Sequence, residues 1–220
     1  MSVHMQREIE RVKKSLLALC AIVEDQVQSS VSALLGRDVK SAESVERRDE
    51  KVDRREVEIE EECLKILALH QPVAVDLRFI VAAMKINNDL ERIGDLAVNI
   101  ARKATSFAAE PSMPIAFDIA GMSEKTQAML RDSLDALVNM DGPLAADVCR
   151  RDDEVDQIKR EIRLGAEEQI RREPQNVRPL LRLLAVSRNL ERIADCATNI
   201  AEDVVYMCEG RIIRHNKADW

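Results

Sequence analysis

Residues 89–101 read DLERIGDLAVNIA, and residues 189–201 read NLERIADCATNIA, so the same segment recurs after 100 positions. A second repeated segment stands upstream of each copy. It reads RRDEKVD at residues 47–53 and RRDDEVD at residues 150–156, an offset of 103. Two matches in the same order with nearly equal offsets indicate that one structural unit occurs twice in the chain.

The composition around these repeats favours long helices. Hydrophobic residues make up 46% of the 220 residues but aromatic residues only 2%, so the core must consist of Leu, Ile, Val, Ala and Met. Six Gly and six Pro leave few positions for turns. Apolar residues recur every three or four positions from Ile9 to Val31 and the pattern stops at Gly36, as on one buried face of a helix. We therefore predict an all-α fold.

Proline and glycine divide the chain into six predicted helices. Two prolines within residues 111–114 mark the boundary between the halves. Short connections between long helices imply antiparallel packing. We predict two antiparallel three-helix bundles, over residues 1–108 and 115–213, joined by a linker at residues 109–114. The predicted helices cover approximately residues 5–35, 38–69, 74–106, 115–140, 144–172 and 178–208.

Charge and cysteine usage narrow the class of protein. A formal charge of −7 with few aromatic residues argues against a nucleic-acid partner, which requires concentrated positive charge or stacking platforms. Five cysteines without a CxxC pair do not resemble a disulfide framework or a zinc site, and reduced thiols are expected. Neither a signal peptide nor an apolar run of about 20 residues is recognisable, so we expect a soluble, cytoplasmic protein.

Acidic residues interrupt the apolar stripes of both halves. In the second predicted helix, Asp49 and Glu56 occupy stripe positions, and Asp53 follows Asp49 by one turn. In the third, Glu91 lies in line with core positions and Asp95 follows by four. The second half repeats the arrangement, with Lys159 in the place of Glu56. Its acidic residues are Asp152, Asp156, Glu191 and Asp195.

Carboxylates gathered on an apolar face need compensation, because they repel one another and are costly to bury. One interpretation is a bound hard cation such as Mg²⁺, Mn²⁺ or ferric iron, which all-oxygen ligands suit. The other is a metal-free helical scaffold with a solvated face, whose acids pair with neighbouring arginines. The candidate arginines are Arg48, Arg92, Arg151 and Arg192.

A carboxylate-bridged metalloenzyme is a third interpretation. Such bundles usually combine Glu with a Glu-x-x-His pair. None of the three histidines (His4, His70 and His215) follows a Glu by three positions, and we expect them to be exposed or capping. The sequence also lacks a GxxxxGK loop and a GxSxG elbow. We therefore expect no enzyme activity.

Several segments resemble the PhoU family. LERIGD at residues 90–95 and LERIAD at residues 190–195 fit the family's two E/DxxxD metal-binding motifs. QPVAVDLR at residues 71–78 fits its QPVAxDLR hairpin, and VEDQV at residues 23–27 fits its VExxV pattern. The second copy of the hairpin keeps only its arginine, Arg178.

The resemblance implies two three-helix bundles related by pseudo-twofold symmetry, homodimers, and clusters of iron, manganese, magnesium or zinc. It implies a negative regulator of the phosphate-starvation (Pho) response that modulates phosphate uptake. As an adaptor, it would contact the ATPase subunit of the phosphate transporter and a sensor histidine kinase, and reach the membrane only through them. The metal sites would be formed by Asp49, Asp53, Glu91 and Asp95, and by Asp152, Asp156, Glu191 and Asp195.

Overall fold

The computed structural model describes residues 3–108 and 117–213, and this part of the chain forms long helices without strands. The six predicted helices are confirmed, with a short 3₁₀ turn before the last. The elements are α1 (Val3–Gly36), α2 (Val39–His70), α3 (Ala74–Ala108), α4 (Ile119–Asn139), α5 (Gly142–Arg172), η1 (Pro174–Asn176) and α6 (Val177–Glu209).

Local sequence explains where these helices begin and end. Asp38 caps α2 by accepting hydrogen bonds from the backbone N–H groups of Lys40 and Ser41, at 3.0 and 3.2 Å. Asp141 caps α5 in the same way through the N–H of Leu144, at 3.0 Å. At the other ends, Gln71, Met140 and Gly210 adopt the left-handed conformation that commonly terminates a helix.

The predicted helix boundaries agree with the structure to within two residues, except at the start of α4. Helix α4 begins at Ile119 rather than at residue 115, because Asp118 is its N-cap and accepts from the N–H of Gly121 at 2.8 Å. Residues 115–116 and the predicted linker at 109–114 lie outside the described residues. Helix α5 begins at Gly142, not at residue 144, because Pro143 fits the first turn of a helix, where no N–H is needed.

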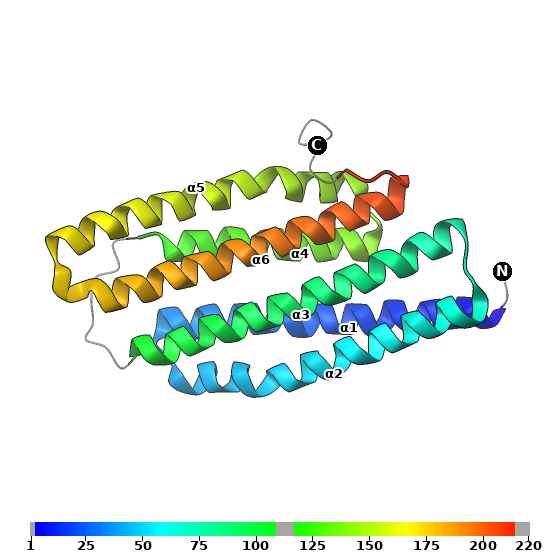
Figure 1. The fold of residues 1–220 in the computed structure, drawn as a ribbon, viewed down its shortest axis with the longest axis horizontal. Coiled ribbons are helices and arrows are strands. Elements are labelled where there is room, and N and C mark those ends of the chain that lie inside the picture. The colour runs from blue at the N-terminus through cyan, green and yellow to red at the C-terminus, as the bar shows by residue number, and fades with distance from the viewer. Residues whose placement is uncertain (1–2, 109–116, 214–220) are drawn as a thin grey trace.

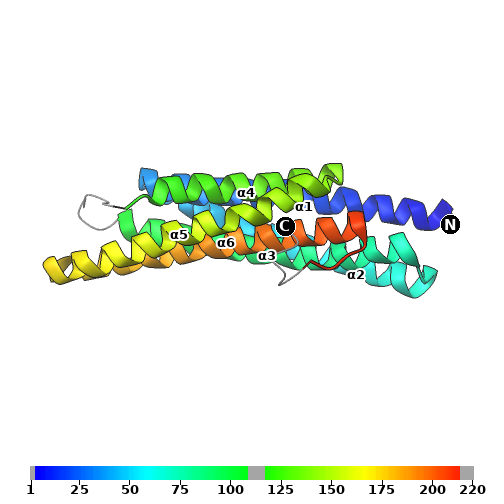
Figure 2. The same ribbon diagram turned by 90° about the horizontal axis from the view of Figure 1, so that it is seen from above.

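The helices form two bundles that lie side by side along their length (Figures 1 and 2). Helices α1, α2 and α3 contact one another, as do α4, α5 and α6. The bundles join mainly through α3 against α6, with a smaller contact between α1 and α4. The predicted antiparallel three-helix bundles are thus confirmed, and α3 and α6, which carry the most similar repeated segments, lie at the centre.

Burial extends the repeat to the first helix of each bundle. The buried positions of α1 recur in α4 after 103 residues; Leu16, Leu19 and Val23 correspond to Ile119, Met122 and Thr126. The offset of 103 therefore applies to α1 and α4 as it does to α2 and α5, whereas α3 and α6 are offset by 100. This correspondence allows the two bundles to be compared residue by residue.

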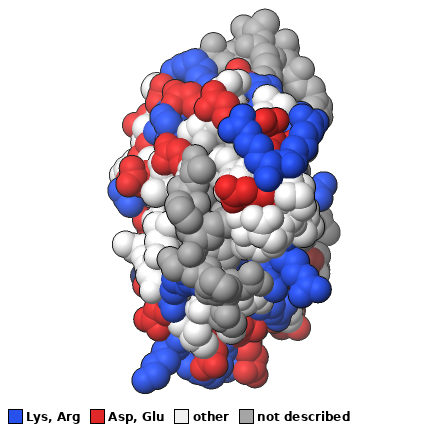
Figure 3. Space-filling model, turned by 90° about the vertical axis from the view of Figure 1, so that its left-hand side faces the viewer, with Lys and Arg blue, Asp and Glu red and all other residues white. Residues whose placement is uncertain are grey.

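The surface carries mixed charge where it is seen end-on. Figure 3 shows Lys and Arg side chains interspersed with Asp and Glu side chains at the end containing the α5–α6 turn. Within residues 3–108 and 117–213, no helix combines the length and the apolar character needed to cross a membrane.

Candidate metal centre

The apolar stripe of α2 is interrupted by carboxylates, as the sequence predicted. Its buried residues are Ala42, Val45, Val52, Ile59, Cys63 and Ile66. Asp49 and Glu56 stand at the predicted steps between them and are half-buried, whereas Asp53 is exposed. On α3, Glu91 is half-buried and Asp95 is exposed.

Carboxylates of α2 and α3 share one electrostatic environment. Burial raises the pKa of Glu91, and the carboxylates of Asp95, Asp53, Glu56 and Asp49 raise it further. Burial likewise raises the pKa of Asp49, with further contributions from Asp53 and Asp95. Asp49 and Glu91 are therefore both within electrostatic range of Asp53 and Asp95. We call Asp49, Asp53, Glu56, Glu91 and Asp95 the first acid cluster.

The first acid cluster has no neutralising ion pair in the part of the chain that the structure describes. Nearby cations pair with other acids: Arg102 Nε lies 3.1 Å from Glu46, and Arg48 contacts Asp25. No three His, Cys, Asp or Glu side chains of the described residues converge tightly enough to hold an ion as they stand. An ion at this cluster would thus require side-chain rotations that bring the carboxylates together.

The second acid cluster, formed by Asp152, Asp156, Glu191 and Asp195, differs in its neutralisation. Burial, followed by repulsion from Glu191, Asp152 and Asp156, raises the pKa of Asp195 to about 6, and Lys159 opposes this rise. Lys159 contacts the carboxylate of Glu191, and its Nζ lies 4.0 Å from Asp156 Oδ1. The second cluster therefore contains its own cation.

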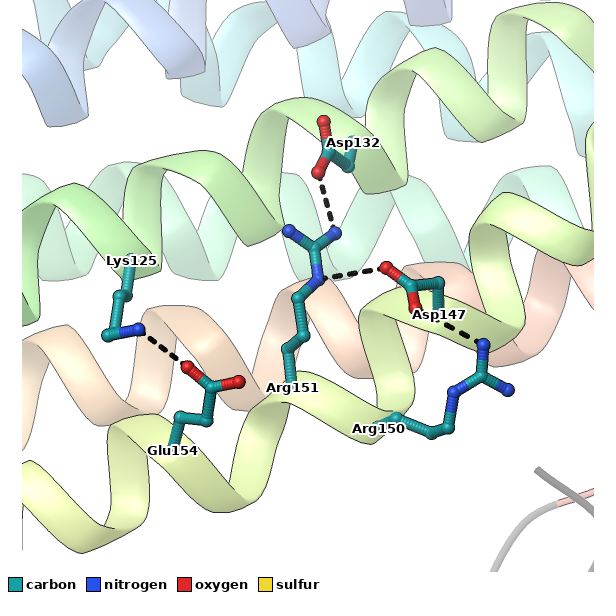
Figure 4. A network of polar contacts seen from close by, with 6 residues as sticks. All are labelled: Lys125, Asp132, Asp147, Arg150, Arg151 and Glu154. Atoms are coloured by element: carbon teal, nitrogen blue, oxygen red, sulfur yellow. Dashed lines mark hydrogen bonds and ion pairs between the residues drawn. The ribbon is translucent and has the colours of Figure 1, made fainter.

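Two of the four arginines expected to pair with the clusters are engaged elsewhere. Arg151 turns towards α4, with its guanidinium 2.6 Å from Asp132, and also lies 3.3 Å from Asp147 (Figure 4). Arg48 contacts Asp25 of α1. The same α4–α5 face carries an ion pair of 2.5 Å between Lys125 and Glu154. The pairs to Asp132, Asp25 and Glu154 join neighbouring helices, whereas the Arg151–Asp147 pair lies within α5. The first acid cluster has no arginine partner among the described ion pairs.

Sequence reasoning missed a buried amide beside the first acid cluster. Gln26 of α1 is fully buried, and neither polar atom of its side-chain amide has a hydrogen-bond partner of acceptable geometry within residues 3–108 and 117–213. The amide faces Asp49 and acts to lower the pKa of that acid. A Cβ placed on Gly94 would lie 3.3 Å from Gln26 Oε1, 3.5 Å from Asp49 Oδ1 and 3.2 Å from Val52 Cγ1. Gly94 therefore allows α1, α2 and α3 to approach one another at this point.

The histidines and cysteines lie apart from this chemistry. His70 Nε2 lies 2.7 Å from Glu8, and His70 stands at the end of α2, about 20 Å along the helix axis from Glu56. His4 is exposed, and His215 lies outside the described residues. Four cysteines are buried, and burial raises the pKa of the Cys20 and Cys63 thiols to about 12, which disfavours the reactive thiolate.

Fold and site together define a duplicated helical-bundle protein with one carboxylate cluster in each repeat. The sequence model of the PhoU domain matches residues 16–104 and 119–204. The chain belongs to the PhoU family.

Named relatives and solved structures resemble the chain over nearly its full length. A "Phosphate-specific transport system accessory protein PhoU homolog" of Pseudomonas putida is 38% identical, over 94% of this chain and 82% of that protein. A homologue of the same name from Aquifex aeolicus is 36% identical, over 95% of each. The crystal structure of PhoU from Pseudomonas aeruginosa superposes with a TM-score of 0.92 at 36% identity, covering 94% of this chain and 99% of that one.

Proposed function

We propose that the protein is an accessory regulator of phosphate-specific transport that restrains phosphate uptake and the phosphate-starvation response. The likeness to relatives named as accessory proteins of that transport system supports the role. The matched acid clusters on a duplicated bundle are the observation that carries the proposal, because they give the regulator two related metal-binding surfaces. Its activity is binding rather than catalysis.

The two acid clusters are its metal sites. Asp49, Asp53, Glu91 and Asp95 would hold the first ion or ions, and a bound cation would relieve the mutual repulsion that raises the pKa values of Asp49 and Glu91. Oxygen donors without histidine or thiolate favour hard cations, so manganese, magnesium or iron fits better than zinc. The residues of the second site would be Asp152, Asp156, Glu191 and Asp195.

With metal bound at these clusters, the protein acts as an adaptor between two partner proteins. The duplicated bundle presents related surfaces twice, which suits simultaneous binding of the transporter's ATPase subunit and a sensor histidine kinase in the cytoplasm. Both partners are membrane-associated systems, so the chain reaches the membrane only through them. A homodimer would double the number of binding surfaces.

A deletion strain tests the regulatory role. In high phosphate, loss of the gene should switch on a phosphatase reporter, and the unaltered gene should restore repression. The double variant Glu91→Ala, Asp95→Ala should bind less metal, measured by elemental analysis, with unchanged helix content by circular dichroism. Normal repression in the deletion strain would overturn the regulatory proposal, and unchanged metal stoichiometry would remove these two residues as ligands.

Purified components test the adaptor role separately. The chain, loaded with Mn²⁺, should retain the ATPase subunit and the cytoplasmic part of the kinase in a pull-down at micromolar concentrations. Retention of neither partner would overturn the adaptor proposal.

A further inference from the structure

The two bundles differ at one buried position next to the acid clusters. The offset of 103 places Gln26 opposite Met129, and both side chains are buried. Gly94 correspondingly stands opposite Ala194. The first bundle therefore has a buried amide and a missing methyl group where the second has a thioether and a methyl group.

Packing alone does not account for the amide. Met and Gln have similar length and volume, and Met129 fills the corresponding position without a polar group. A buried amide oxygen without a hydrogen-bond donor lowers stability, because that acceptor loses its water. Gln26 thus carries a cost that an apolar side chain of the same shape would avoid.

The amide points to the same gap as a carboxylate of the first acid cluster. Gln26 Oε1 and Asp49 Oδ1 both lie within 3.5 Å of the point where a Cβ on Gly94 would stand. The two oxygens are both acceptors and cannot satisfy each other. The amide nitrogen of Gln26 can donate to Asp49 and acts to lower the pKa of that acid, but Gln26 Oε1 has no donor among the described residues. A cation is the partner that attracts both, and amide oxygens are common ligands of hard cations.

We propose that Gln26 is an additional, neutral ligand of the metal site at the first acid cluster, and that Gly94 provides the space for it. The inference rests on the proposed metal-binding function and adds a residue of α1 to a site otherwise formed by α2 and α3. It makes the two sites unequal: the first has an amide oxygen and, among the described residues, no cation in contact with its carboxylates, whereas the second has Met129 and Lys159. The first site therefore binds hard divalent cations more tightly.

The matched variants Gln26→Met and Met129→Gln test the proposal, because each gives one bundle the residue of the other. Mn²⁺ is the probe, titrated calorimetrically into the chelator-treated full chain, with thermal unfolding measured with and without the ion. Gln26→Met should weaken binding at the tighter site about tenfold, the size expected when a metal site loses a supporting group. It should also leave the metal-free melting temperature unchanged or higher. Met129→Gln should lower that temperature and leave the tighter site intact.

A third variant, Gln26→Glu, retains an oxygen at the same position. It should bind Mn²⁺ at least as tightly as the unaltered chain, with a lower metal-free melting temperature because another carboxylate joins the cluster. Unchanged Mn²⁺ affinity in Gln26→Met would overturn the role of Gln26 and leave the metal-binding function standing. If the unaltered chain bound no Mn²⁺, both would be overturned.

Discussion

The two acid clusters show how a duplicated unit diverges. Four carboxylates recur at matching positions, but Glu56 of the first cluster is replaced by Lys159 in the second. The lysine contacts Glu191 and partly neutralises its own cluster. The first cluster, with five carboxylates, has no contacting cation among the described ion pairs; Arg102 acts on Asp49 only from a distance, and the proposed source of compensation is a bound ion. The comparison teaches that the repeat conserves the carboxylates while the source of the compensating charge differs.

The surroundings of this position differ in the same sense. Asn87 donates to the Glu56 backbone carbonyl oxygen at 2.9 Å and to its side-chain Oε1 at 3.4 Å. The corresponding residue in α6, Ser187, donates a hydrogen bond within its own helix, to the Leu184 carbonyl oxygen at 3.0 Å. An amide thus accompanies the glutamate in the first bundle, and a self-satisfied hydroxyl accompanies the lysine in the second.

The largest expected effect follows from removing the internal cation. Lys159→Glu should lower the free energy of unfolding of the metal-free protein by about 2 kcal/mol, because a charged hydrogen bond to Glu191 becomes a repulsion. It should also strengthen Mn²⁺ binding at the second cluster. Urea unfolding with and without Mn²⁺ measures both effects. Lys14→Glu, the same charge change at an exposed position of α1, is the control and should change neither by much. Equal effects of the two variants would show that only net charge matters.

The converse substitution should make the first cluster resemble the second, because it gives the first cluster a lysine of its own. Glu56→Lys places an ammonium beside Asp53 and Glu91 and also offers a donor to Asn87 Oδ1, a buried atom without a hydrogen-bond partner. The free energy of unfolding of the metal-free protein should rise by about 1 kcal/mol or slightly more. Stabilisation by Mn²⁺ should fall. A variant that gained stability and still bound Mn²⁺ with full affinity would contradict the compensation argument.

The fold was predictable because its signals are repeated along the chain. Apolar residues at three- and four-residue steps and the breaks at Pro72 and Pro174 indicated the helices, and the repeated segments indicated the duplication. The start of α4 was harder to predict from the sequence, because Ile115 continues an apolar pattern while the boundary depends on the capping geometry of Asp118. In the site, Asp49 and Glu56 were recognisable because each interrupts an apolar stripe.

Gln26 was not recognised as a site residue for a physical reason. It follows Glu24 and Asp25, so this turn of the helix reads as a polar, solvated face. Its burial results from the close approach of three helices at Gly94, which is a tertiary property. The one available signal was the offset of 103, which pairs Gln26 with Met129 and so marks a core position.

Exchanging the small residues of the two central helices sharpens the comparison further. Gly94→Ala improves helix propensity by about 1 kcal/mol, but the new Cβ would crowd Val52 and Gln26 at 3.2 and 3.3 Å. We expect a nearly unchanged free energy of unfolding and weaker Mn²⁺ binding. Ala194→Gly should lower the free energy of unfolding by about 1 kcal/mol without weakening Mn²⁺ binding at the first cluster. Calorimetric titration of both variants with Mn²⁺ measures their affinities at the first cluster. Equal affinities in the two variants would contradict a role for the gap at Gly94.

The smallest expected effect concerns the pH dependence of the second cluster. The pKa of Asp195 is about 6 in the folded chain, compared with an ordinary value of 3.8 for an aspartic acid in the unfolded chain. Folding therefore favours the protonated acid. The stabilising contribution of this group is therefore complete below about pH 4 and is lost as the pH rises through about 6. Because the side chain retains solvent contact, the loss should stay below about 1 kcal/mol, less than the shift alone would give. In metal-free protein, Asp195→Asn should raise the melting temperature at pH 7.5 and change it little at pH 4. A uniform shift at both pH values would instead assign the effect to packing.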